Sequence, residues 1–185
     1  MVLPGHLAGG YLVTRIILAI THAVFTPAQT LALLIIGTLA GEGPDIDLIW
    51  YSFSHIVLKS KKNDDHREFI THAPLVWLIG SLIVVAIGAL IGSLFIEYIG
   101  WLILAGSWTH FILDSIEYGI MWLWPWSHKR YALRLAASDN SNEPADEKAG
   151  TISGYWRFIT KRYIHYWSFW LEIILTCVAI YAAFH

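Results

Sequence analysis

Long apolar stretches alternate with shorter polar connections along most of the chain. Apolar runs of this kind, without strict alternation of polar and apolar positions, are typical of membrane-spanning helices, which need about 20 residues. The second run is short for a complete span. We predict an all-α protein, a polytopic transmembrane helical bundle with about five membrane segments plus interfacial helices. The five predicted segments cover residues 7–25, 28–40, 75–95, 99–116 and 163–184.

The connections between these segments differ from one another in composition. Residues 46–58 are aromatic and moderately apolar, which predicts a helix lying along the membrane interface. The tryptophan-rich segment 121–126 is expected to anchor at headgroup level. Residues 138–150 are polar and predict a cytoplasmic loop. The length fits one domain over residues 1–185.

Composition favours an integral membrane protein. Hydrophobic residues make up 56% of the chain and charged residues only 14%, whereas a soluble domain is about a quarter charged. A net charge of -2 argues against a nucleic-acid binder, which would be strongly basic. The single cysteine, Cys177, excludes a disulfide within the chain and a thiolate metal cluster.

Basic residues predict the orientation in the membrane. Of the twelve Lys and Arg residues, four lie in the connection 56–73 and seven in 119–162. With five spans these two connections fall on the same side, which the positive-inside rule makes cytoplasmic. We therefore expect a cell (inner) membrane protein with its N-terminus inside and its C-terminus outside.

Polar side chains from four stretches gather on this predicted cytoplasmic side. The orientation rests on Lys and Arg residues in the connections, so the shared depth of the histidines and acids is independent of it. Acids in apolar surroundings are costly unless a cation meets them, and a metal ion is the best candidate. The gathered residues are His6, Asp45, Asp47, His66, Arg67, Thr71, His72, His110, Asp114 and Glu117.

The fourth segment carries the clearest metal-binding pattern. Ser107, His110, Asp114 and Glu117 are spaced by 3, 4 and 3 residues, so they share one face of a helix. His110 and Asp114 can then bind one ion, and nitrogen with carboxylate oxygen suits zinc, manganese or iron. The alternative is a polar stripe that forms hydrogen bonds between helices without a metal.

The other candidates are weaker when each is taken alone. Asp45 and Asp47 have an alternative role in the first turn of a helix, where the helix dipole favours acids. That role explains one carboxylate better than both. His66 and His72 each lie in a polar connection, where a single histidine is usually just solvated.

The order of these motifs resembles the YdjM-like family of membrane-bound metal-dependent hydrolases, which is related to the zinc-dependent phospholipase C-like hydrolases. An N-terminal His, G-x-PDID, HR followed by TH, H-x-x-x-D, and a Gly with an aromatic-Pro segment carry the resemblance, from His6 to about Ser127. The last span lies outside it. Glu68 departs from the glycine common after HR. The resemblance implies a metal site at His6, Asp45, Asp47, His66, His72, His110 and Asp114.

We therefore expect a metal-dependent hydrolase that uses one or two divalent ions, zinc before manganese or iron. Arg67 is predicted to hold a phosphate, and Glu117 or Glu68 to act as general base or to orient a ligating histidine. A site at headgroup depth favours a lipid-like or phosphodiester substrate. The alternatives are a metal-ion-binding membrane transporter and a structural membrane protein without catalysis. A transporter needs polar groups along a path across the bilayer, and segment 75–95 has almost none.

Overall fold

The computed structural model describes residues 3–48, 53, 69–133, 152–161 and 163–185. The predicted interfacial helix over 46–58 lies mostly outside these residues, and the predicted loop over 138–150 lies wholly outside them. The candidate residues His66, Arg67 and Glu68 also lie outside the described part of the chain.

The prediction of an all-α protein is confirmed, because the regular elements of the described residues are all helices. One isolated antiparallel bridge joins Ile120 to Tyr131. The long helices match the five predicted apolar segments to within a few residues. They are α1 (Leu3–Thr21), α2 (Pro27–Glu42), α4 (Pro74–Leu90), α5 (Leu94–Asp114) and α7 (Trp167–Phe184). The shorter elements are η1 (Gly43–Ile46), η3 (Ile70–His72), α6 (Ile152–Lys161) and η5 (Tyr163–His165).

Local chemistry sets the helix boundaries. The Thr26 side chain accepts a hydrogen bond from the Gln29 N–H at 3.3 Å, and the Gln29 side chain accepts one from the Thr26 N–H at 3.0 Å. This reciprocal capping box begins α2. The predicted boundary between segments 75–95 and 99–116 lies a few residues too late, because Gly92, with a φ of 67°, follows the end of α4 and Ser93 caps α5. Glu97 lies instead in the first turn of α5.

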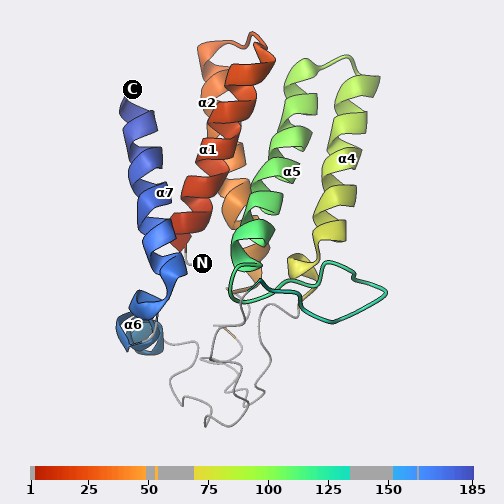
Figure 1. Cartoon of the computed structure of the whole chain (residues 1–185). Helices are drawn as coiled ribbons and strands as arrows, with labels where there is room; N and C mark the ends of the chain where they lie inside the picture. Colours follow the sequence, from red (N-terminus) through yellow and green to blue (C-terminus); the bar gives the residue numbers. More distant parts are fainter. Residues whose placement is uncertain (1–2, 49–52, 54–68, 134–151, 162) are drawn as a thin grey trace.

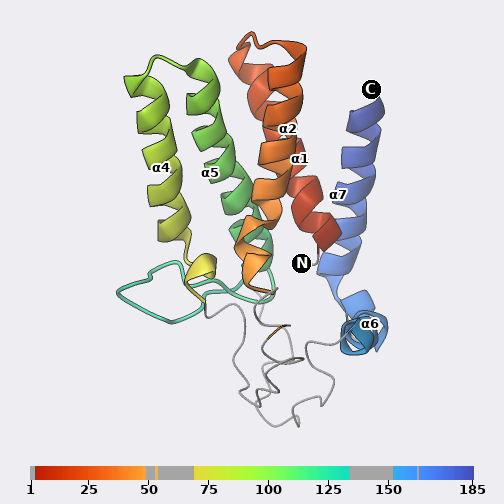
Figure 2. The same ribbon diagram turned by 180° about the vertical axis from the view of Figure 1, so that it is seen from behind.

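The long helices lie side by side and form an upright bundle (Figure 1). The connections 22–26 and 91–93 lie at one end of this bundle. The other end, which we call the site end, carries η1, η3, the segment 115–133 and the N-terminal turn of α1, as the reverse view also shows (Figure 2). The short α6 lies at the base of α7, across the direction of the long helices.

Glycines allow α1, α2 and α5 to approach one another closely. A Cβ atom added at Gly10 would lie 2.6 Å from the Gly37 carbonyl oxygen, and one at Gly106 would lie 2.8 Å from the same atom. A Cβ at Gly41 would lie 2.4 Å from the His6 carbonyl oxygen. Small residues permit such packing between helices in membranes. The first turns of α1 are thereby held against the end of α2.

The prediction of five membrane spans is confirmed only in part. Within the described residues, two helices, α5 and α7, are long and apolar enough to cross a membrane, and α4 is apolar but shorter. The other predicted spans fall short for physical reasons. Helix α2 has 16 residues and α4 has 17, against the roughly 20 that a span needs. Helix α1 includes the polar residues His6, Thr14 and Arg15.

Candidate metal centre

The six predicted metal ligands within the described residues come together at the site end, as the predicted topology requires. His6 lies in the first turns of α1, and His72 lies in η3 directly before α4. All six are buried, and four have no exposed surface at all. The six residues are His6, Asp45, Asp47, His72, His110 and Asp114.

Five of these residues form two overlapping groups that share His110. In the first group, His6 Nε2 lies 3.3 Å from Asp114 Oδ1, and His110 Nε2 lies 4.0 Å from Asp114 Oδ2. In the second group, Asp45 Oδ1 lies 3.1 Å from His72 Nε2 and 3.7 Å from His110 Nε2. Ligand atoms of a tetrahedral zinc lie about 3.3 Å apart, so each group has nearly the spacing that an ion requires.

A backbone carbonyl fixes the orientation and tautomer of His110. Its Nδ1 lies 2.9 Å from the Gly41 oxygen. Because a carbonyl oxygen only accepts hydrogen bonds, Nδ1 carries the proton of the neutral ring. The lone pair of Nε2 then points toward the carboxylates, and this atom has no hydrogen-bond partner among the described residues. Metal-binding histidines commonly have this arrangement.

His6 is fully buried and stacks on His110 with 3.8 Å between ring centroids. Neither of its ring nitrogens has a hydrogen-bond partner within the described part of the chain. Each such polar group costs about 1–3 kcal/mol when buried without a partner. No lysine or arginine is buried among the described residues, although Asp45, Asp47 and Asp114 are. A divalent cation would bind one nitrogen of each ring, the Nε2 atoms of His6 and His110, next to the buried carboxylates.

Asp47 belongs to neither group and lies instead behind His72. Its Oδ2 accepts a hydrogen bond from His72 Nδ1 at 2.8 Å and another from the Thr71 hydroxyl. The Thr71 carbonyl oxygen in turn accepts a hydrogen bond from Trp77 Nε1 at 2.7 Å. A carboxylate on the far nitrogen of a histidine orients that ring toward a metal. This geometry fits an orienting role and differs from the ligand role predicted for Asp47.

Electrostatics give His72 a positive charge while the site is free of metal. Burial opposes that charge, but the hydrogen bonds to Asp45 and Asp47 outweigh it and raise the pKa of His72 to about 9. Burial also opposes the charge on Asp45, but the hydrogen bond from His72 and the nearby His110 and His6 rings hold its pKa below the usual range. A metal ion would therefore displace a proton from His72.

The predicted polar stripe of the fourth segment is only partly directed to this cluster. The Ser107 hydroxyl donates to the Ile103 carbonyl oxygen of its own helix at 2.8 Å. Glu117 is buried and accepts a hydrogen bond from the Ser168 hydroxyl of α7, and it belongs to neither ligand group. Helix α5 ends at Asp114, so helical spacing no longer governs where Glu117 lies.

Comparison with known proteins supports the family that the motif order predicts. A family model described as YdjM inner membrane protein matches residues 1–184. The match extends over α7, so the expectation that the last span lies outside the family is wrong. No curated protein and no solved structure matches the chain. The family description gives a location and no reaction. The chain belongs to the YdjM family of inner membrane proteins.

Proposed function

We propose that this protein is a multi-pass metal-dependent hydrolase whose site faces the cytoplasm. One observation carries the proposal: two ligand groups meet at His110, whose Nε2 lacks a hydrogen-bond partner among the described residues, as do both nitrogens of His6. Buried polar groups in proteins are nearly always paired. In a hydrogen-bond network without metal, the alternative drawn from the sequence, His6 Nε2 would have only its 3.3 Å contact with Asp114 Oδ1, and His110 Nε2 would have no hydrogen-bond partner among the described residues.

The residues present fit zinc and, less specifically, manganese or iron. Three imidazole nitrogens and two carboxylates are a nitrogen and oxygen ligand set of the kind these ions use. The number of ions is constrained by His110, which has only Nε2 to offer because Nδ1 donates to the Gly41 carbonyl. A second ion would need a bridging carboxylate, and the nearest oxygens of Asp45 and Asp114 lie 3.7 and 4.0 Å from Nε2.

The protein's own residues prepare the site for hydrolysis. A divalent ion bound there would lower the pKa of a coordinated water to about 7 and neutralise charge that develops on a phosphoryl or acyl oxygen. Asp47 holds the ring of His72, and the Gly41 carbonyl holds that of His110, so both are oriented before an ion binds. Arg67 and Glu68 stay the predicted phosphate-binding and base residues. The hydrogen bond from Ser168 favours a supporting role for Glu117.

Exposed apolar stripes support five membrane segments rather than two. Leu31, Ile35 and Leu39 follow one face of α2 at intervals of four residues, with exposed fractions of 59%, 50% and 59%. A similar stripe of isoleucines, at positions 79, 83 and 87, follows α4. Continuous apolar stripes of this kind are rare on soluble proteins. The 16 residues of α2 span about 24 Å, which a locally thinned bilayer accommodates.

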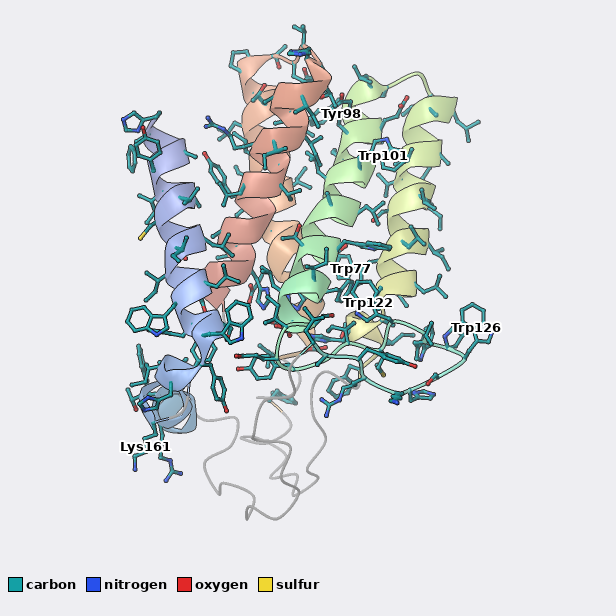
Figure 3. All side chains as sticks on the ribbon, viewed as in Figure 1. Trp77, Tyr98, Trp101, Trp122, Trp126 and Lys161 are labelled. Atoms are coloured by element: carbon teal, nitrogen blue, oxygen red, sulfur yellow. The ribbon has the colours of Figure 1, made fainter. Side chains whose placement is uncertain are left out.

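Aromatic and basic side chains support the cytoplasmic orientation. Tryptophans 77, 122 and 126 lie toward the site end, and Tyr98 and Trp101 lie toward the opposite end (Figure 3). Two such levels are typical of aromatic belts at the two membrane surfaces. Lys161 marks the site end in the same view. The described Lys and Arg residues other than Arg15 lie in α6 and in the segment 115–133, both at this end.

An apolar groove supports a substrate with a hydrocarbon chain. The groove has a volume of about 380 Å³ and lies between α1, α4 and α5. Trp108, in its lining, is two residues before His110, so the groove reaches nearly the depth of the cluster along α5 but lies on a different face of that helix. A headgroup at the cluster and a chain in the apolar region match a lipid-like phosphodiester. The lining residues are Ile17, Leu78, Trp101, Leu104, Ala105 and Trp108.

Metal analysis of the purified protein tests the proposal. His110→Ala and Asp114→Ala are each expected to lose most of the bound metal. Ser107→Ala, on the same helix, is the matched control and is expected to keep it, because Ser107 donates only to carbonyls of its own helix in the described structure. Unchanged metal content in both cluster variants would refute the site.

Activity separates the functional classes. Metal-dependent hydrolysis of a phosphodiester and lipid panel, lost on chelation and in His110→Ala, is expected. Ion flux in proteoliposomes without hydrolysis would favour the transporter instead.

A further inference from the structure

We propose that Glu172 of α7 is a positioning residue for the metal ligand His6. This inference rests on the proposed metal site and assigns the last helix a part in it. Glu172 is 5% exposed, and its Oε1 accepts a hydrogen bond from the backbone N–H of Gly5 at 3.0 Å. Its Oε2 accepts a hydrogen bond from the hydroxyl of the buried Tyr163. A carboxylate that is 166 residues from His6 in the sequence therefore binds the residue beside it.

The bond to Gly5 has the chemistry of a helix cap. Helix α1 begins at Leu3, so the Gly5 N–H is one of the first amides that have no acceptor within the helix. A carboxylate that accepts this bond satisfies the amide and interacts favourably with the positive end of the helix dipole. The cap usually comes from a residue just before the helix, but here Glu172 supplies it from another helix.

Close packing transmits the position of this cap to the cluster. A Cβ atom at Gly5 would lie 2.8 Å from Glu172 Cγ, so the first turn of α1 sits directly against the carboxylate. The next residue, His6, has its Nε2 3.3 Å from Asp114 Oδ1. Metal–ligand distances are held to within about 0.2 Å, so a loosened first turn would displace His6 from any shared ion.

Helix α7 also provides a matched control. Ser168 lies one turn before Glu172, is also buried, and donates a hydrogen bond to Glu117; it contacts the Tyr163 hydroxyl as Glu172 does, but it is not the acceptor of the Gly5 N–H. Ser168→Ala therefore removes a buried hydrogen bond from the same face of the same helix and leaves the cap of α1 in place.

The first experiment measures Co²⁺ affinity of the full chain in detergent by its visible absorption. Loss of a supporting residue of this kind lowers metal affinity about 10–100-fold, which is the effect expected for Glu172→Leu. Glu172→Gln keeps an acceptor for the Gly5 N–H while losing the charge, and it is expected to stay within about threefold of the unmodified protein. Ser168→Ala is expected to match the unmodified protein. If Glu172→Gln and Glu172→Leu lost equal Co²⁺ affinity, the charge of Glu172 and not its hydrogen bond to Gly5 would be responsible, and the positioning role would be refuted.

A double-mutant cycle shows whether the effect passes through His6. In a His6→Ala background, Glu172→Leu is expected to cause no further loss of affinity, whereas in a His72→Ala background it is expected to cause its full loss. A general loss of structure would lower affinity in both backgrounds, and that result would overturn the inference. If Glu172→Leu does not fold, Gly5→Ala replaces it in the cycle, because the added Cβ perturbs the same contact from α1.

Failure of the proposed metal site and failure of the Glu172 cap give different results. If the unmodified protein binds no Co²⁺ or Zn²⁺, the proposed metal site is wrong and His6 has no ligand role to support. In that case hydrogen exchange at the Gly5 amide decides whether the cap exists. Faster exchange in Glu172→Leu than in Ser168→Ala would show that Glu172 caps α1 without any role in metal binding. Equal exchange in the two variants would show that Glu172 does not cap α1.

Discussion

The substitution Gly41→Ala adds one methyl group where α1 and α2 are in close contact, and it tests whether this packing sets the geometry of the proposed metal site. Gly41 lies at the end of α2, its carbonyl oxygen accepts the hydrogen bond from His110 Nδ1, and its Cα faces the first turns of α1. In Gly41→Ala the new Cβ would lie 2.4 Å from the His6 carbonyl oxygen and 3.0 Å from Gly10 Cα. Both neighbours are backbone atoms, so no side chain can rotate away to make room.

The size of the effect follows from these distances. Ordinary contact begins at 3.4 Å, so α1 and α2 must separate by about 1 Å at this point. Overpacking of this kind costs about 1–3 kcal/mol, against a gain of about 1 kcal/mol from replacing glycine with alanine in a helix. Metal geometry is the more sensitive quantity, because a shift of about 1 Å far exceeds the tolerance of about 0.2 Å. We expect a small loss of stability and a loss of metal affinity of at least about tenfold.

Gly80→Ala is the matched control. Gly80 also lies inside a helix, α4, and a Cβ added there has no described atom within 4 Å. It is expected to bind metal normally and to be as stable as the unmodified protein or up to about 1 kcal/mol more stable. Metal content and thermal unfolding in detergent are measured for both variants. If Gly41→Ala kept full metal content and affinity, the close contact between α1 and α2 would not determine the site geometry.

Three further predictions test other parts of the argument. Asp47→Asn should lower metal affinity about 10–100-fold without removing a ligand, and an unchanged Co²⁺ titration would contradict an orienting role for this residue. Because the hydrogen-bonded His72 has a pKa of about 9 and must lose its proton to bind an ion, metal affinity should rise about tenfold per pH unit from pH 7 until it levels off near pH 9. A flat profile would refute the displacement of that proton. In a Cys177→Ser background, a cysteine at Val24 should react with an impermeant thiol reagent from the periplasm, and one at Trp126 only after the cells are opened. The reverse pattern would place the site outside.

The sequence predicts those parts of the site that depend on periodicity and topology. His110 and Asp114 are four residues apart on one helix, so their shared direction follows from helical geometry. Asp45 and His72 both lie in the connection between α2 and α4, and the two predicted crossings by α4 and α5 return the chain to the same end at His110. In the structure these four side chains are buried and lie close together, as the periodicity and the topology predict.

The remaining parts depend on contacts that the sequence pattern does not reveal. Gly41 acts through its backbone carbonyl, and every residue type has one, so no side chain signals this role. Helical spacing predicts that Glu117 shares a face with His110 and Asp114, but α5 ends three residues earlier and Glu117 accepts a hydrogen bond from Ser168 of α7. Glu172 acts through long-range packing against α1, and its position in an apolar helix predicts burial without naming the partner.

The hydrogen bond between Gly5 and Glu172 joins the first turn of α1 to α7. During synthesis the ribosome completes α1 to α5, and with them every described ligand, well before residue 172 emerges. The newly made protein therefore passes through a stage in which all of these ligands exist but the first turn of α1 lacks its acceptor. A chain shortened before α7 would retain each proposed metal ligand and still lack the hydrogen bond between Gly5 and Glu172.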